Sequence, residues 1–225
     1  MVGFGPADLG SNPSRATSNI SRCPYCEIQF RMAVMNAGTS WSRLMNPLRL
    51  AKPLSDMSIK TIAVLGAGQM GNGITQVAAC AGYNVTMVDI EQSYVDRGLA
   101  TIEKSLAKLV SKERMTQEDA DAARGRITTA IDRQACADCD LVVEAVPEIL
   151  SLKQEIFAEL DQICKPETIL ASNTSSISIS TIAEATNRPE QVIGMHFMNP
   201  VPIMKLVEII NGKQTSDATN AAVIE

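Results

Sequence analysis

From Met57 onward, short runs of apolar residues alternate with longer segments in which apolar residues recur at helical spacing. The short runs are typical of strands buried on both faces, and the longer segments are typical of amphipathic helices. Their alternation predicts an α/β fold with a doubly wound, mainly parallel sheet. The predicted strands span residues 62–65, 84–88, 126–129, 141–146, 168–172, 192–195 and 205–210. The predicted helices span residues 74–83, 92–113, 117–124, 151–163 and 178–186.

Two of these helices follow the second strand in direct succession. The first has one apolar stripe, and Thr116 is expected to cap the second. We therefore expect a helical hairpin inserted after the second strand, longer than a usual crossover.

A basic stripe lies on the first helix of this hairpin, where Lys104, Lys108 and Lys112 recur every four residues. One interpretation is a solvated helix face. The other is a landing site for the phosphorylated tail of a substrate, which both Ser105 and Lys112 could reach. Spacing alone leaves the two interpretations open.

A glycine-rich turn joins the first predicted strand to the first helix. It has the pattern G-x-G-x-x-G, and an acid, Asp89, ends the second strand 23 positions after the first glycine. This order is typical of a dinucleotide site in a Rossmann-like fold. The glycines let a pyrophosphate approach the helix N-terminus, while the acid can accept both ribose hydroxyls and repel a 2′-phosphate. We therefore predict NAD as the cofactor. The predicted contacts in this region are Gly66, Gly68, Gln69, Met70, Gly71 and Asp89.

Polar residues also follow later strands, at the edge where an open parallel sheet holds its ligands. Glu148 lies just beyond the strand 141–146, and Lys153 lies in the first turn of the next helix. A basic residue in a first turn opposes the helix dipole, so we interpret Lys153 as a ligand contact. The turn 173–176, Asn-Thr-Ser-Ser, is expected to cap the helix after it. Four polar residues exceed the needs of one cap, so this turn is a further candidate site.

The chain has a single histidine, His196, which follows the strand 192–195. If this strand pairs antiparallel with the strand 205–210 about Pro202, His196 lies directly opposite Glu208. The carboxylate would then fix the tautomer of the imidazole, as expected for a general base. The alternative is a histidine packed in a turn and a glutamate on a solvated strand face.

Five segments together resemble the NAD-binding domain of 3-hydroxyacyl-CoA dehydrogenases, most closely the bacterial 3-hydroxybutyryl-CoA type. They are GAGQMGNGI, VDI, VVEAVPE, ASNTSS and GMHFMNPVPIMKLVEII. In that family the histidine of the HFxNP motif removes the proton of the substrate hydroxyl, which implies His196 as the base and Glu208 as its partner. The serine of the SNTSS motif binds the substrate and falls on Ser175. Further cofactor contacts are implied for Asp89, Glu148, Lys153 and Asn199.

The resemblance implies the NAD-dependent oxidation of 3-hydroxyacyl-CoA to 3-ketoacyl-CoA, in fatty acid or butanoate metabolism. The base takes the hydroxyl proton while hydride leaves C3 for the nicotinamide. Ser105 and Lys112 are implied as contacts to coenzyme A, which favours the substrate interpretation of the basic stripe.

Proteins of this family continue into a helical domain that closes over the substrate, supplies an asparagine and forms a homodimer. We expect the NAD-binding domain to span residues 57–215, and residues 216–225 to begin the linking helix, so that the chain is a fragment. Two alternatives remain: another NAD-dependent hydroxyacid dehydrogenase on the same fold, and a non-catalytic NAD-binding fragment.

Composition adds limits to this picture. The 225 residues are 45% hydrophobic with a net charge of −5, which argues against nucleic acid as the main partner. The absence of a long apolar run argues against a membrane span. Residues 1–56 are Ser-, Pro- and Arg-rich and carry few acids. We interpret them as a disordered tail or as the product of a start codon placed too early, and the protein as cytoplasmic. A transit peptide, and with it the mitochondrial matrix, is the alternative.

The cysteines include two C-x-x-C pairs, Cys23 with Cys26 and Cys136 with Cys139. This spacing also occurs in metal and redox sites. Because no histidine lies near either pair, we predict free thiols in a reducing compartment and no metal.

Overall fold

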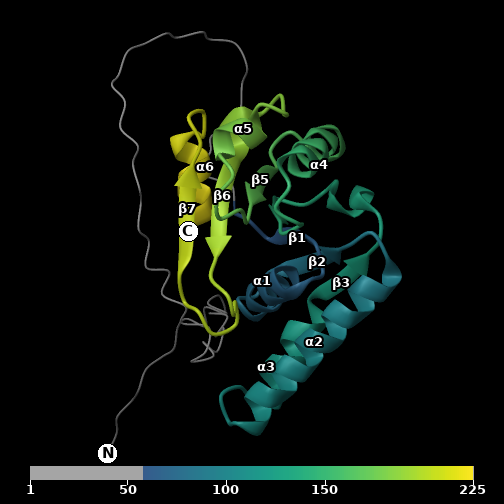
Figure 1. Ribbon diagram of the computed structural model, residues 1–225. Helices are drawn as coiled ribbons and strands as arrows, with labels where there is room; N and C mark the ends of the chain where they lie inside the picture. Colours follow the sequence, from purple (N-terminus) through teal and green to yellow (C-terminus); the bar gives the residue numbers. More distant parts are fainter. Residues whose placement is uncertain (1–57, 225) are drawn as a thin grey trace, which may run out of the picture.

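A seven-stranded sheet dominates the computed structural model, which describes residues 58–224 (Figure 1). The strand order is β3-β2-β1-β4-β5-β6-β7, in which the neighbours from β3 to β6 are parallel and β7 pairs antiparallel with β6. The strands are β1 (Thr61–Leu65), β2 (Asn84–Val88), β3 (Ile127–Ala130), β4 (Leu141–Glu144), β5 (Ile169–Ser172), β6 (Val192–Phe197) and β7 (Val207–Asn211). The predicted doubly wound, mainly parallel sheet is confirmed. The interpretation of residues 1–56 lies outside the described residues.

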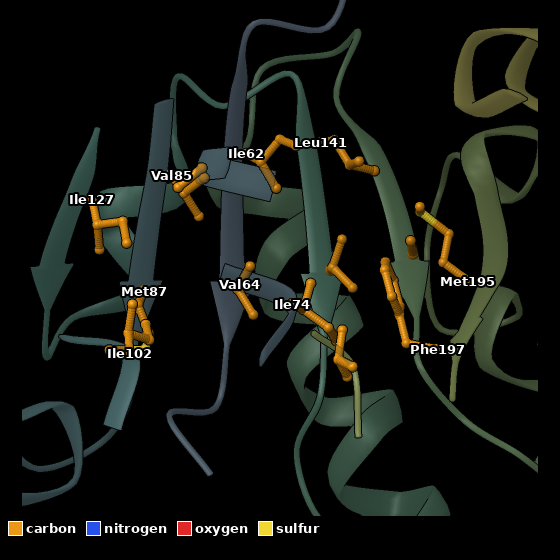
Figure 2. Packing of buried hydrophobic residues seen from close by; sticks show 14 of the residues in the cluster. Ile62, Val64, Ile74, Val85, Met87, Ile102, Ile127, Leu141, Met195 and Phe197 are labelled. Carbon is orange, nitrogen blue, oxygen red and sulfur yellow. The ribbon is translucent and has the colours of Figure 1, made fainter. Parts of the chain in front are cut away.

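Side chains that alternate along the strands build a core on each face of this sheet. On β1, Ile62 and Val64 belong to a cluster with Ile74 of α1 and Ile102 of α2, part of which Figure 2 shows. Leu65, one position on, belongs to a cluster built with α4 and α5 on the other face. The helices are α1 (Gln69–Cys80), α2 (Gln92–Ser111), α3 (Gln117–Gly125), α4 (Leu150–Ile163), α5 (Ile179–Ala183) and α6 (Asp217–Ile224). Two 3-10 helices span Arg133–Cys136 and Pro189–Gln191.

The predicted helical hairpin is present as α2 and α3, which project beyond the sheet (Figure 1). Thr116 caps α3 as expected, because its hydroxyl accepts a hydrogen bond from the Asp119 N–H at 3.1 Å. Loss of such a cap typically costs about 1 kcal/mol.

Several predicted boundaries were wrong for local reasons. The helix α1 begins at Gln69, directly after the glycine turn, and not at residue 74, where its apolar spacing becomes visible. The strand β4 ends at Glu144 and not at residue 146, because the Glu144 side chain accepts a hydrogen bond from the Val146 N–H at 2.8 Å. The helix α5 ends at Ala183 and not at residue 186, and just beyond that end the Asn187 N–H donates to Asp161 at 3.0 Å.

The predicted cap of α5 was also misplaced. Ser178 caps this helix, because its hydroxyl accepts from the Thr181 N–H. Capping of α5 therefore does not account for the polar residues of the turn 173–176. Thr174, in this turn, accepts hydrogen bonds from the N–H groups of Ser176 and Ile177.

Candidate active site

The glycine turn between β1 and α1 is held against two neighbouring strands. Gly66 has a φ of 100°, which favours glycine, and its N–H donates to the Val88 carbonyl at 2.7 Å. A Cβ on Gly66 would lie 2.7 Å from the Ala145 carbonyl oxygen, and one on Gly71 would lie 1.7 Å from the Gly66 oxygen. Two of the three glycines are therefore required by packing.

Gly68 differs from these two. It is exposed, has a φ of −67°, and a Cβ on it would meet no atom within 4 Å. The turn thus has an open side at Gly68, where α1 begins and its first N–H groups lack partners within the helix. An open backbone surface at a helix N-terminus is what a phosphate group needs.

Asp89 lies at the end of β2 and reaches back to the turn. Its Oδ2 accepts from the Ala67 N–H at 2.6 Å, and its Oδ1 accepts from the Ile90 N–H at 2.7 Å. The acid predicted to bind ribose therefore lies beside the glycine turn, as a dinucleotide site requires.

A buried ion pair lies where β4 and β5 end. The ammonium of Lys153 lies 2.6 Å from Oε1 of Glu144, and the two side chains are 1% and 0% exposed. Glu144 also accepts from the Ser172 hydroxyl at 2.6 Å. A buried carboxylate with this many donors is well satisfied, and removing one partner of such a pair is typically strongly destabilising.

Lys153 was predicted to be a ligand contact because a basic residue in the first turn of a helix is unfavourable next to the helix dipole. The structure supplies an internal reason, the pairing with Glu144, and a second carboxylate, Glu148, lies 3.3 Å from the same ammonium. Sequence reasoning missed Glu144 and its partner Ser172. An acid inside an otherwise apolar strand was the signal that could have revealed it.

Glu148 connects this ion pair to the turn 173–176. It accepts hydrogen bonds from the hydroxyls of Thr174 and Ser176. Partial burial alone would raise the pKa of Glu148, but the Thr174 hydrogen bond and the Lys153 charge outweigh that effect and hold the pKa below its ordinary value. Glu148 is therefore a carboxylate at neutral pH, with a side chain that is 39% exposed.

Ser175 lies between these two anchored residues and is itself exposed. Within the described part of the chain its hydroxyl has no hydrogen-bond partner. A rigid turn thus presents one unpaired hydroxyl at the edge of the sheet, as a substrate-binding serine would require.

His196 and Glu208 lie directly opposite each other in the antiparallel register of β6 and β7, as predicted. Nδ1 of His196 lies 2.8 Å from Oε2 of Glu208, and the side chains are 23% and 40% exposed. This contact leaves the other ring nitrogen available for a substrate. Asn173 links this pair to the turn, because its side-chain oxygen accepts from the Phe197 N–H at 2.8 Å.

Comparisons with known proteins agree with this geometry. The model of the family described as 3-hydroxyacyl-CoA dehydrogenase, NAD binding domain, matches residues 61–225. This chain belongs to that family.

Three relatives of this chain carry the name 3-hydroxybutyryl-CoA dehydrogenase. A probable 3-hydroxybutyryl-CoA dehydrogenase of Deinococcus radiodurans is 56% identical over 72% of this chain and 58% of that protein. The 3-hydroxybutyryl-CoA dehydrogenase of Bradyrhizobium diazoefficiens is 52% identical over 72% of this chain and 55% of its own length. The crystal structure of (S)-3-hydroxybutyryl-CoA dehydrogenase PaaH1 from Ralstonia eutropha is 48% identical with a TM-score of 0.72, covering 74% of this chain and 59% of that one. The chain thus spans somewhat over half the length of these relatives.

NAD, the cofactor predicted from the glycine turn and Asp89, is the cofactor of this family's domain. The residues present fit it: the open backbone at Gly68 leaves room for a pyrophosphate, and Asp89 lies where a ribose would follow. The Gln69 amide donates to Oδ1 of Asn199 at 3.2 Å, so the start of α1 contacts the loop after β6. The individual contacts predicted for Gly66, Gly68, Gln69, Met70, Gly71, Asp89, Glu148, Lys153 and Asn199 stay predictions.

Two predicted substrate residues lie apart from this candidate site. Ser105 and Lys112 are on α2 and at its C-terminal cap, and α2 packs against α1 and α3 near the sheet edge formed by β3. Lys104, Lys108 and Lys112 are all exposed, as either interpretation of the basic stripe requires. A role in binding coenzyme A stays a prediction.

An apolar cavity of about 460 Å³ lies elsewhere in this domain. It is bordered by α1, α6 and the hairpin of β6 and β7, and its lining includes Met195, Phe197 and Ile209. Because side chains alternate along strands, His196 and Glu208 face away from it. Among residues 58–224 no helix combines the length and the apolar character that crossing a membrane requires.

Proposed function

We propose that this chain forms the NAD-binding half of a dehydrogenase that oxidises the 3-hydroxyl group of 3-hydroxyacyl-CoA, with 3-hydroxybutyryl-CoA as the first substrate to test. The observation that carries the proposal is the pairing of His196 with Glu208 at 2.8 Å, beside a turn that presents Ser175. The names of the three relatives described above support the same substrate type.

His196 acts as the general base in this proposal. Glu208 accepts a hydrogen bond from Nδ1–H and so fixes the tautomer in which Nε2 carries a lone pair. Nε2 then takes the proton of the 3-hydroxyl, which Ser175 orients through a hydrogen bond. NAD, when bound, supplies the acceptor for the hydride that leaves C3, and the product is a 3-ketoacyl-CoA. A positioned base typically contributes about 10²–10⁴-fold in rate.

The turn and the base are held in one frame. Asn173 donates its N–H to the Glu144 carbonyl at 2.8 Å and accepts from Phe197, the neighbour of His196. Preorganised geometry of this kind supplies much of the advantage of an intramolecular reaction.

Further features of the longer protein belong to the same proposal. We infer a homodimer and a cytoplasmic location. The bacterial relatives and the unoxidised thiols of Cys136, Cys139 and Cys164 support the location. A following helical domain that closes over the substrate is part of the same hypothesis, with α6 (Asp217–Ile224) as the helix that leads to it.

The test is a substrate screen that follows NADH formation with 3-hydroxybutyryl-CoA, longer 3-hydroxyacyl-CoA esters and free 3-hydroxybutyrate. Because the chain matches only part of its relatives, the screen is run on the chain and on a version extended by the segment that follows in those relatives. Activity with a CoA ester that disappears in His196→Ala supports the proposal. Preference for the free acid would instead favour another hydroxyacid dehydrogenase, and NAD binding without turnover in the extended protein would favour a binding module.

A further inference from the structure

Two carboxylates share one buried ammonium beside the loop that follows β4. Lys153 lies 2.6 Å from Glu144 and 3.3 Å from Glu148. Counted together, the three groups carry one net negative charge. Which carboxylate holds the cation decides where that negative charge resides.

The contacts of Glu144 make it the stronger partner. It is fully buried, and besides the ammonium it accepts from the Val146 N–H at 2.8 Å and the Ser172 hydroxyl at 2.6 Å. All three of these groups are donors, so the site fits a carboxylate and not a carboxylic acid. Lys153 thus lies closer to the buried Glu144, at 2.6 Å, than to the 39% exposed side chain of Glu148, at 3.3 Å.

The remaining negative charge lies next to the candidate reaction site. Glu148 accepts from Thr174 and Ser176, the two residues that flank Ser175. Hydride transfer requires the nicotinamide ring to approach the substrate that Ser175 and His196 hold. That ring carries a unit positive charge in NAD⁺ and none in NADH, so a nearby carboxylate distinguishes the two forms.

We propose that Glu144 sets the charge of the cofactor site: by holding Lys153 it leaves Glu148 negative, and the site therefore favours NAD⁺ over NADH. This role rests on the proposed function, because it takes Ser175 and His196 to mark the position of the substrate. Glu144 is a positioning residue, since it acts through Lys153 and Glu148 and not by contact with the cofactor.

The test measures the dissociation constants of NAD⁺ and NADH by calorimetry for the wild type, three test variants and one control variant. Glu144→Gln keeps the shape of the side chain but frees the Lys153 charge to neutralise Glu148, and Glu148→Gln removes the carboxylate directly. In both variants the ratio of NADH to NAD⁺ dissociation constants should fall about tenfold, the effect of a unit charge acting over about 10 Å at an effective dielectric constant of about 20.

The double variant Glu144→Gln/Lys153→Met separates charge from structure. It removes one negative and one positive charge, so the net charge of the site returns to that of the wild type, and the preference for NAD⁺ should return with it. If Glu144 contributed only to packing, its loss would weaken the binding of NAD⁺ and NADH equally. The double variant would then not differ from Glu144→Gln in the ratio of the two dissociation constants. Glu184→Gln is the matched control, because Glu184 is exposed and distant from this loop in sequence.

The outcomes distinguish this inference from the proposed function. An unchanged ratio in Glu144→Gln and Glu148→Gln, with both nucleotides still bound, would overturn the charge role of Glu144 and leave the dehydrogenase proposal standing. Failure of the wild type to bind either nucleotide would overturn both. If Glu144→Gln does not fold, the Glu148→Gln ratio and the double variant still decide the question.

Discussion

Replacing Gly71 by alanine is expected to disrupt the fold of the cofactor turn, whereas the same change at Gly68 is expected mainly to impair NAD binding. The two glycines lie three positions apart in one motif and receive the same methyl group. Their surroundings differ, so the pair separates the packing role of a glycine from its ligand role.

At Gly71 the added Cβ would lie 1.7 Å from the Gly66 carbonyl oxygen, where real Cβ contacts are essentially never shorter than 3.0 Å. The Gly66 carbonyl would have to move by more than an ångström, and the 2.7 Å hydrogen bond from its N–H to Val88 resists that movement. Overpacking typically costs about 1–3 kcal/mol, and a clash of backbone with a methyl group belongs at about 3 kcal/mol or above. For a domain of this size that cost lowers the melting temperature by roughly 6–12 °C.

At Gly68 the added Cβ would meet nothing within 4 Å, and the φ of −67° suits any residue. The expected loss of stability is about 0.5–1 kcal/mol, because alanine is a poorer N-cap than glycine. The methyl group would occupy the open side of the turn, so NAD affinity should fall at least about tenfold.

Thermal unfolding without nucleotide measures the first effect, and calorimetric titration with NAD measures the second. Gly82→Ala serves as a control for strain without a ligand role, because Gly82 has a φ of 103° and lies after α1. A Gly71→Ala protein that melts with the wild type would refute the packing argument. A Gly68→Ala protein that binds NAD as the wild type does would refute the assignment of the pyrophosphate to this turn.

Four further predictions follow from the site and its supports. His196→Ala should lower turnover by at least about 100-fold in an extended, active protein while NAD affinity is unchanged, and Glu208→Gln should lower it less; steady-state rates and nucleotide titrations measure both. NADP should bind more weakly than NAD in parallel titrations, because Asp89 would face its 2′-phosphate. Asp140→Asn should destabilise the protein at pH 7, because burial raises the Asp140 pKa but hydrogen bonds from Lys165, Lys60 and Thr61 lower it to about 2. The stability that the carboxylate contributes is therefore present above pH 3.8 and is lost as the pH falls through about 2. Denaturant titrations of variant and wild type should show their difference in unfolding free energy closing over that pH range. Burial raises the pKa of Cys164 to about 11, so its alkylation at pH 8 should be slow until the protein is unfolded, as mass spectrometry of the labelled protein can show.

Features fixed by short stretches of sequence were predicted well. The cap at Thr116 depends on a neighbour in the chain, and the glycine turn and Asp89 belong to one continuous strand–turn–helix–strand segment; all are present in their expected places. The contact of His196 with Glu208 was also predicted, because an antiparallel register about Pro202 determines every opposite pair once the turn is located.

Features that depend on several strands at once were missed. The network of Glu144, Lys153 and Ser172 joins β4, α4 and β5, and no spacing along the chain reveals which polar side chains meet across a sheet. The first turn of α4 therefore suggested a ligand for Lys153 and gave no sign of its internal partner Glu144, while the ligand contact itself stays a prediction. The prediction of the α5 cap was wrong for a simpler reason. Several hydroxyl side chains lie close together before this helix, and Ser178 is the one that caps it.

The antiparallel pairing of β7 with β6 has a consequence for how such a site can diverge. His196 and Glu208 lie 12 positions apart in one hairpin, while the glycine turn and Asp89 belong to the first two strands. The candidate base and the predicted nucleotide contacts thus belong to separate segments, which meet through the contact of Gln69 with Asn199 and through the apolar core that joins Phe197 and Val201 to Ile74 of α1. A hairpin that evolves toward another reaction must therefore keep the apolar positions that pack against α1, whereas His196 and Glu208, on the opposite face of its strands, can change without disturbing that core.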